Sequence, residues 1–398
     1  MFFLQFFVFG AWYATTGSYM SAHGMTHAIH WAYTVGPLSA LIAPFFLGYI
    51  ADRFFATERV LGTLAVLGAF PLWFAADVPE GKAAWFIILI LLHTLCFFPT
   101  LGLANTLAFH HIENRERQFP IVRLFGTIGW ILAGVLVSGI LSADTSSMPL
   151  RIAAVACLLF GLYNLSLPHT PPPARGQEVS YRKILGFDAI KRLSSVPFWT
   201  FLVCDVIVAI PYALYFAYVP LYMLNAGLTD PAFKMTFGQG MEVVIMAVLP
   251  LIFHRLGIKW MVVIGMGAWA VRYGLFALST VTQPLVPIMG GILLHGVSFS
   301  FVFIAAQIYL DRRATPEIRG QAQGLLVMVR SGLGMLIGAQ IGGFLFNNLV
   351  GDATHVMSAW QSLWIVPLVL GGLMTLAMAL FFYDDSLRDE QEAATATG

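Results

Sequence analysis

Polar side chains recur at helical spacing inside several apolar stretches of this sequence, and they are the groups that could do chemistry. In the stretch 119–140, Arg123, Thr127 and Trp130 stand at positions i, i+4 and i+7. This spacing places them on one face of a helix. A polar group in apolar surroundings is costly unless it has a partner, so each one is a candidate binding residue.

Three further stretches carry similar sets. In 196–225, Tyr212 and Tyr215 share a predicted face, with Asp205 two turns earlier and Pro211 expected to kink the helix. In 233–253, Gln239 and Glu242 are i, i+3 partners, and in 284–309, His295 and Phe299 are i, i+4 partners followed by Ser300. We expect these sets to line one cavity.

The chemistry of these residues predicts the kind of ligand. The aromatic members that could stack on a flat ring are Trp130, Tyr212, Tyr215 and Phe299. Gln239 and Glu242 could hydrogen-bond vicinal hydroxyls. The stretches contain no phosphate-cradling glycine loop and no basic cluster, which favours an uncharged ligand. An aromatic ring joined to a polyol is a nucleoside; a sugar would fit less well.

The composition of the chain indicates whether these stretches are surrounded by water or by lipid. The chain has 398 residues, of which 59% are hydrophobic and 10% charged, with a mean hydropathy of +0.80. Soluble domains carry about 25% charged residues. A net charge of +1 argues against a nucleic-acid partner. The three cysteines fall inside apolar stretches and indicate no disulfide framework. We therefore expect the chain to lie in a lipid bilayer.

Twelve apolar stretches are each long enough to cross a bilayer, which takes roughly 20 residues. The predicted spans are 2–22, 29–51, 59–77, 84–108, 119–140, 149–167, 196–225, 233–253, 258–278, 284–309, 320–348 and 358–384. The fold class is therefore an all-α membrane protein. We expect a six-helix half in 1–167, a linker in 168–195, a second six-helix half in 196–385 and a tail in 386–398.

The distribution of basic residues predicts the orientation. Sixteen lysines and arginines fall on the side that holds the linker and the tail, against three on the other side. By the positive-inside rule, both termini are then cytoplasmic. Arg272 and Arg330 lie within predicted spans, where structural or interfacial contacts are the favoured role.

The tandem halves resemble the major facilitator superfamily. The loop after the second span keeps Gly48, Asp52 and Arg53 of the superfamily signature but has Phe55 and Ala56 where Gly and Arg are usual. Arg255 and Lys259 lie in the corresponding loop of the second half, which follows the eighth span. The resemblance implies a substrate site between the halves, near the bilayer midplane.

Longer motifs resemble the bacterial nucleoside:proton symporter family across nearly the whole chain. They include Gly10-Ala11-Trp12, Pro99-Thr100-Leu101-Gly102, Phe119-Pro120-Ile121-Val122-Arg123, Gln239-Gly240-Met241-Glu242 and Arg319-Gly320-Gln321-Ala322-Gln323. The resemblance implies nucleoside import across the inner membrane, with Arg123, Thr127, Gln239, Glu242 and Phe299 lining the site. It implies neither a cofactor nor a catalytic or metal site, and we expect a monomer in the bilayer with nucleoside and protons as its partners.

Three positions depart from the family pattern. Tyr212 and Tyr215 replace Gln and Asn, which puts the base selectivity in question. Ser300 replaces an Asp that the family uses in proton coupling. Serine does not titrate near neutral pH, so we expect Glu242 to carry the proton, with Asp205 as the second candidate. An uncoupled facilitator, or a transporter of sugars or other small polar solutes, is the alternative.

Several of these residues also have a simpler interpretation. Arg123 could anchor its helix at the cytoplasmic interface, and Gln239 with Glu242 could join helices without binding a ligand. His23, His27 and His30 have the spacing of metal ligands but fall in a short outer loop, which favours a solvated loop. The sequence shows no serine–histidine–aspartate set, zinc motif or P-loop, which argues against a membrane enzyme.

Overall fold

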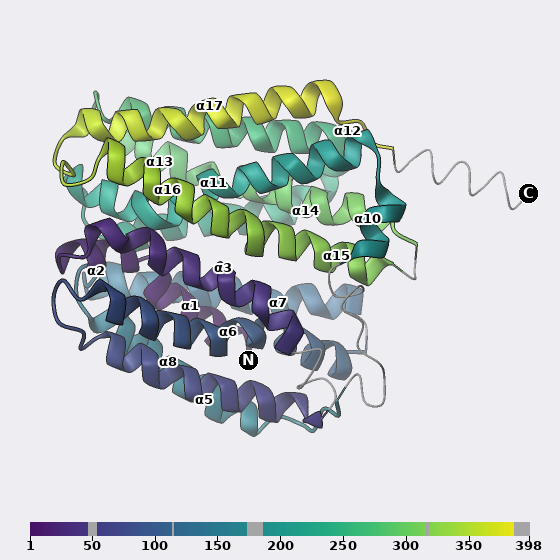
Figure 1. The fold of residues 1–398 in the computed structure, drawn as a ribbon. Coiled ribbons are helices and arrows are strands. Elements are labelled where there is room, and N and C mark those ends of the chain that lie inside the picture. The colour runs from purple at the N-terminus through teal and green to yellow at the C-terminus, as the bar shows by residue number, and fades with distance from the viewer. Residues whose placement is uncertain (47–53, 114, 173–185, 316–317, 386–398) are drawn as a thin grey trace, which may run out of the picture. The chain divides into compact units, whose positions relative to one another are not determined.

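The computed structural model describes residues 1–46, 54–113, 115–172, 186–315 and 318–385. Every regular element in these residues is helical. The helices before the linker are α1 (Phe2–Tyr13), α2 (Thr16–Ala22), η1 (Thr26–Ala28), α3 (Ile29–Phe46), α5 (Thr57–Ala75), α6 (Ala83–His111), α7 (Arg115–Gly134), the π-helical segment η3 (Val135–Ile140) and α8 (Met148–Leu165) (Figure 1).

The remaining helices follow the linker. They are α10 (Phe187–Leu193), α11 (Val196–Asn225), α12 (Pro231–Ser279), α13 (Leu285–Leu293), α14 (His295–Arg313), α15 (Arg319–Val327), the π-helical segment η4 (Met328–Gly334), α16 (Met335–Leu349) and α17 (Met357–Phe381). Helix α12 contains two of the predicted spans. They meet at Gly257, whose φ of 67° is readily adopted only by glycine.

Ten helical stretches of the described residues are long and apolar enough to cross a membrane. They correspond to the third through twelfth predicted spans, and the all-helical membrane fold is confirmed. The first predicted span is divided into α1 and α2. At the break, the Thr15 and Thr16 hydroxyls donate to the carbonyl of Trp12 at 3.0 and 2.7 Å, a type of bond that bends helices.

The chain forms two compact units. Unit 1 contains residues 1–179, 213–236 and 339–355, and unit 2 contains residues 180–212, 237–338 and 356–398. The ends of α11 and α16 and the start of α12 therefore belong with the N-terminal helices. The predicted boundaries at 167 and 196 stay a prediction.

Glycines bring helix backbones together within unit 1, whose buried core runs through α1, α5, α6 and α8. A Cβ added to Gly161 of α8 would lie 2.8 Å from the Val66 nitrogen and 2.9 Å from the Gly62 carbonyl oxygen of α5. Close approach of small residues is how helices associate in lipid, where the hydrophobic effect does not drive them together. Apolar side chains such as Phe70 and Leu162 remain exposed, as a lipid-facing surface requires.

Candidate functional site

The predicted face of α7 lies within unit 1, against α1. A Cβ on Gly126 would lie 2.9 Å from the Phe6 ring, so the two helices can approach closely only because this residue is glycine. The Arg123 guanidinium lies 4.2 Å from the centre of the Phe6 ring and 5.7 Å from that of Phe2. These distances are those of cation–π contacts. The Arg123 side chain is exposed, and that of Thr127, one turn later, is half-buried.

Trp130 and Tyr215 meet at a common aromatic neighbour in unit 1. The Trp130 ring centre lies 5.9 Å from that of Phe216, and the Tyr215 ring centre lies 5.1 Å from it. Trp130 also contacts Phe9 edge-to-face at 5.2 Å. Trp130 is half-buried, whereas Tyr215 is fully buried. Aromatic packing in unit 1 therefore accounts for much of the surface of both residues.

In unit 2, two glycines bring α12 and α14 into backbone contact. A Cβ on Gly296 would lie 2.5 Å from the Met241 carbonyl carbon and oxygen, and one on Gly238 would lie 2.9 Å from the Ile292 oxygen. Any side chain at Gly296 would force the helices apart. This close crossing places Glu242 beside His295.

Glu242 and His295 form a pair of titratable groups at this crossing. The Glu242 Oε2 and His295 Nε2 atoms are 3.9 Å apart, which is beyond hydrogen-bond distance. The His295 side chain is 2% exposed and the Glu242 side chain 15%. Gln239, one turn before Glu242, is 6% exposed, and its Oε1 has no hydrogen-bond partner among the described residues.

Aromatic rings extend from this pair toward α11. The His295 imidazole stacks on Phe299 at 5.5 Å, and Phe299 lies 6.2 Å from Tyr212 with an interplanar angle of 36°. Tyr212 also contacts Trp269 and Phe303 edge-to-face. Unit 2 therefore brings together five of the predicted site residues, namely Tyr212, Gln239, Glu242, His295 and Phe299.

Tyr212 and Tyr215 have different neighbours despite their helical spacing. Tyr212 belongs to unit 2 and contacts the rings around Phe299, whereas Tyr215 belongs to unit 1 and contacts Phe216. The prediction that one ligand contacts residues of both sets stays a prediction.

Asp205 forms a buried ion pair with Arg330 in unit 2. Its Oδ1 accepts from Arg330 Nε at 2.8 Å and from Nη2 at 2.6 Å, and Asp205 is fully buried. The guanidinium also lies 4.0 Å from the centre of the Phe303 ring. The structural role expected for Arg330 agrees with this contact. Because a guanidinium neutralises it, Asp205 is less suited than Glu242 to take up a proton.

Arg272 is a second buried arginine that the sequence analysis did not place in the site. It is fully buried, donates from Nη2 to the Ser298 hydroxyl at 2.8 Å, and lies 4.5 Å from the centre of the Trp269 ring. Ser298 lies between His295 and Phe299 on α14, so Arg272 belongs to this cluster. An arginine in the middle of an apolar stretch was the signal that could have identified it.

Ser300 is fully buried on α14, one residue after Phe299. Its hydroxyl has no hydrogen-bond partner among the described residues. No carboxylate therefore occupies the position where the family resemblance implies one.

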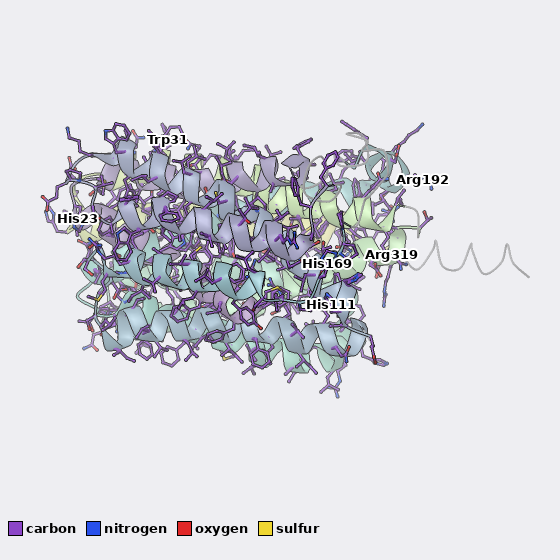
Figure 2. All side chains as sticks on the ribbon, turned by 90° about the horizontal axis from the view of Figure 1, so that it is seen from below. His23, Trp31, His111, His169, Arg192 and Arg319 are labelled. Atoms are coloured by element: carbon purple, nitrogen blue, oxygen red, sulfur yellow. The ribbon has the colours of Figure 1, made fainter. Side chains whose placement is uncertain are left out.

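His23, His27 and His30 form no metal-binding group among the described residues, and His30 belongs to helix α3 and not to the outer loop. His27 pairs with Asp352 at 3.2 Å, and both side chains are exposed. His23 lies at one end of unit 1, and His111 and His169 lie at the other (Figure 2). At that other end, His111 bonds Thr170 at 2.9 Å and His169 lies 3.1 Å from Glu58.

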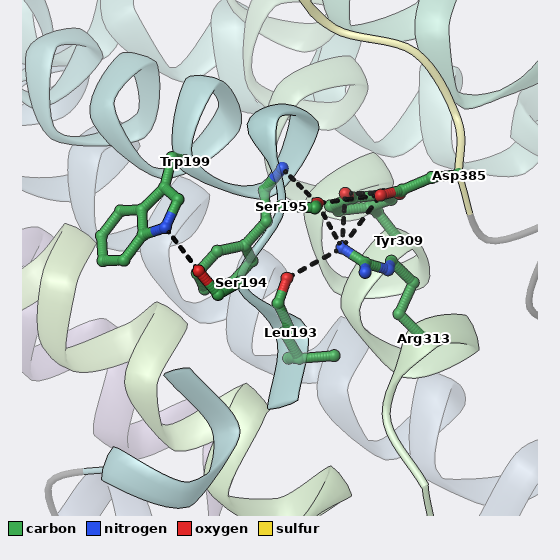
Figure 3. Close-up of polar contacts among 8 residues, drawn as sticks. Leu193, Ser194, Ser195, Trp199, Tyr309, Arg313 and Asp385 are labelled. Carbon is green, nitrogen blue, oxygen red and sulfur yellow. Dashed lines mark hydrogen bonds and ion pairs between the residues drawn. The ribbon is translucent and has the colours of Figure 1, made fainter. Parts of the chain in front are cut away.

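A polar network in unit 2 joins the end of α10 and the turn before α11 to α14 and the segment after α17. Asp385 accepts from Ser195 at 2.9 Å and from Tyr309 at 2.8 Å, and it pairs with Arg313 at 3.2 Å (Figure 3). Arg313 also donates to the Leu193 carbonyl at 3.1 Å. This network was not predicted, because its members are far apart in the sequence.

A buried carboxylate also lies outside the spans of unit 1, in the loop before α8. Asp144 accepts from the Ser138 hydroxyl at 2.7 Å and from the Ala232 backbone N–H at 3.1 Å, near the start of α12. Burial raises the pKa of Asp144 above its ordinary value, and the nearby Asp230 charge acts in the same direction.

Comparison with known proteins identifies the family of the chain. The family described as nucleoside H+ symporter matches residues 1–386. The chain is 32% identical to YegT of Escherichia coli over 394 residues, covering 96% of this chain and 92% of YegT. It is 28% identical to the xanthosine permease of Escherichia coli over 399 residues, covering 96% and 94%.

The fold is also that of a solved transporter. The crystal structure of the nucleoside transporter NupG matches with a TM-score of 0.85 at 26% identity, covering 96% of this chain and 97% of that one. The resemblance drawn from the motifs is thus confirmed. The chain is a multi-pass membrane protein of the nucleoside H+ symporter family, a family of transporters and not of enzymes.

Proposed function

We propose that this protein imports nucleosides across a bacterial inner membrane by proton symport, as a monomer with both termini in the cytoplasm. Gln239 and Glu242 bind the hydroxyls and polar edges of the nucleoside, and Tyr212 and Phe299 stack on its base. Arg123 and Thr127 contribute polar contacts, with Trp130 and Tyr215 as further aromatic contacts. No cofactor takes part.

The observation that carries the proposal is the mixed cluster of unit 2 in a chain of this family. Gln239 is almost fully buried and keeps an acceptor oxygen without a partner among the described residues. Glu242 lies one turn away, the Phe299 ring stacks on its partner His295, and the Tyr212 ring lies beside Phe299. A nucleoside has the same two kinds of surface, a flat ring and a set of hydroxyls.

The buried Ser300 favours the second candidate, an uncoupled facilitator or a carrier of sugars or other small polar solutes. A serine hydroxyl cannot titrate near neutral pH, so this position cannot carry a proton. In the symport proposal Glu242 has that role.

Ligand-dependent thermal stability of the purified protein tests the substrate class. A ligand that binds only the folded state raises its stability with concentration, so nucleosides, nucleobases and sugars can be ranked. We expect nucleosides to stabilise the protein most. Gln239→Ala and Glu242→Gln should each weaken nucleoside binding about 5- to 150-fold, the equivalent of about 1–3 kcal/mol for one buried polar contact.

Gln361→Ala on α17 is the matched control, because it removes a glutamine from a helix that supplies none of the cluster residues and should leave binding unchanged. Nucleoside binding at the affinity of the unmodified chain in both cluster variants would remove Gln239 and Glu242 from the site. Stabilisation by sugars and not by nucleosides would favour the second candidate.

A further inference from the structure

We infer that His295 and Glu242 together hold the transported proton, with the imidazole as the second proton-binding group. This inference rests on the proposed symport and names the residue that would work with Glu242. The geometry of the α12–α14 crossing supports it. The two side chains are 3.9 Å apart, and the backbone contact at Gly296 leaves their helices little freedom to separate.

The described residues around the pair include other charged and polar groups. Arg272, on the later part of α12, acts electrostatically on His295 and is held by Ser298 and Trp269. On α11, Asp205 is already neutralised by Arg330, and Tyr212 packs on Phe299. With a neutral imidazole, Glu242 and Arg272 balance each other, so one added proton changes the net charge of the cluster by one.

His295 is also the one side chain of α14 between Leu294 and Gln307 that carries a basic, proton-accepting group. Ser300, at the position where the family resemblance implies an acid, carries none. The imidazole lies five residues before Ser300 on the same helix. Histidine therefore supplies α14 with a proton-binding group that its serine cannot provide.

In this pair, nucleoside binding and proton binding should favour each other, which is what symport requires. A nucleoside that covers Glu242 removes water from its carboxylate, and a carboxylate that loses its water is less stable in its charged form. A proton on the neighbouring imidazole, or on the carboxylate itself, relieves that cost. Nucleoside binding therefore favours proton binding. Because linkage is reciprocal, proton binding favours the nucleoside equally.

Nucleoside affinity of the purified full-length chain, measured across about pH 5 to 8, tests the inference. Uridine and adenosine are the probes. In the unmodified chain their affinity should rise as the pH falls, by at most about tenfold per pH unit, which is the limit for one linked proton. His295→Gln keeps a polar side chain that does not titrate, so it should bind both probes with little pH dependence. Glu242→Gln should reduce the pH dependence as well.

His93→Gln is the matched control. His93 is a fully buried histidine of α6 in unit 1, with Nδ1 2.8 Å from the Gly68 carbonyl oxygen. It should keep the pH dependence of the unmodified chain. In proteoliposomes, His295→Gln should still exchange labelled nucleoside across the membrane but should no longer concentrate it under an inward proton gradient.

Three results would overturn the inference, and one of them also decides the proposed function. If His295→Gln keeps the full pH dependence and concentrates nucleoside, the proton is held elsewhere, while nucleoside transport stands. If folded His295→Gln binds neither probe at any pH, His295 is a ligand contact and not a proton site. If the unmodified chain binds no nucleoside at all, the proposed function fails together with the inference.

Discussion

Asp205 and Arg330 place two opposite charges in the apolar interior of unit 2, and each stabilises the other. Arg330 donates hydrogen bonds from Nε and Nη2 to the same Asp205 oxygen, at 2.8 and 2.6 Å. Variants of this ion pair can show whether Asp205 has a structural role or takes part in proton transfer.

Removing one member of the pair should destabilise the protein more than removing both. Asp205→Ala leaves the Arg330 charge buried without its counter-ion, which costs about 3–5 kcal/mol in buried pairs. The double variant Asp205→Ala with Arg330→Met removes both charges and should recover much of the loss. Thermal unfolding of the three proteins in one detergent measures this. A structural pair also predicts that the double variant still concentrates nucleoside.

Equal stability of the single variant and the unmodified chain would show that the pair contributes nothing. Loss of concentrative uptake in a stable double variant would instead place Asp205 on the proton route.

Local spacing predicted some residue contacts and not others. Gln239 and Glu242 are one turn apart, so a helical pattern alone identifies them. Arg330 is 125 residues from Asp205, and Arg272 is 26 residues from Ser298. Such partners are fixed by the packing of helices, which a single sequence does not encode in its local spacing. For the same reason, Tyr212 and Tyr215 share a predicted face but have different neighbours.

The contact between α12 and α14 decides the geometry of the site at the scale of elements. Gly238 and Gly296 allow the two backbones to touch, and the residues that follow them, Glu242 and Phe299, are positioned by that crossing. The helices were predictable from their apolar length. Their crossing point was not, because many glycines in this sequence have no such contact.

Gly296→Ala should disturb both folding and binding. The added Cβ would lie 2.5 Å from the Met241 carbonyl group, so the helices must separate. Overpacking of this kind costs about 1–3 kcal/mol, and it should also move Glu242 away from His295 and weaken nucleoside binding. Thermal unfolding and binding measurements on the same preparation check both effects.

Gly240→Ala on α12 is the control for the helical glycine itself. A Cβ there meets nothing within 4 Å, so the change should be neutral or should stabilise the helix by up to about 1 kcal/mol. If the two alanine variants behave alike, the close crossing at Gly296 does not determine the site.

The breaks in the helices were less predictable than the helices. The first predicted span appears as α1 and α2 because threonine hydroxyls bond to the carbonyl of Trp12. The π-helical segment η4 carries Arg330, and such segments often occur at functional positions. Hydropathy reports how apolar a segment is, and it does not report where a side chain competes for a backbone carbonyl.

For the whole molecule, composition and motifs predicted the class correctly. An apolar chain of this length with twelve apolar stretches indicates a multi-pass membrane protein, and the family assignment is confirmed over residues 1–386. The internal division was harder to predict. Contacts such as Gln340 to Thr34 at 2.7 Å and Tyr13 to Phe216 at 5.4 Å join late helices to unit 1, across long distances in sequence.

We propose that this protein uses a proton gradient to concentrate nucleosides. Uptake of labelled nucleoside into proteoliposomes that contain the unmodified chain, with an inward proton gradient imposed, tests this most directly. For a proton symporter, we expect the internal nucleoside to rise above the external concentration and a protonophore to abolish this accumulation. An internal concentration that only reaches the external one, with or without the gradient, would rule out symport.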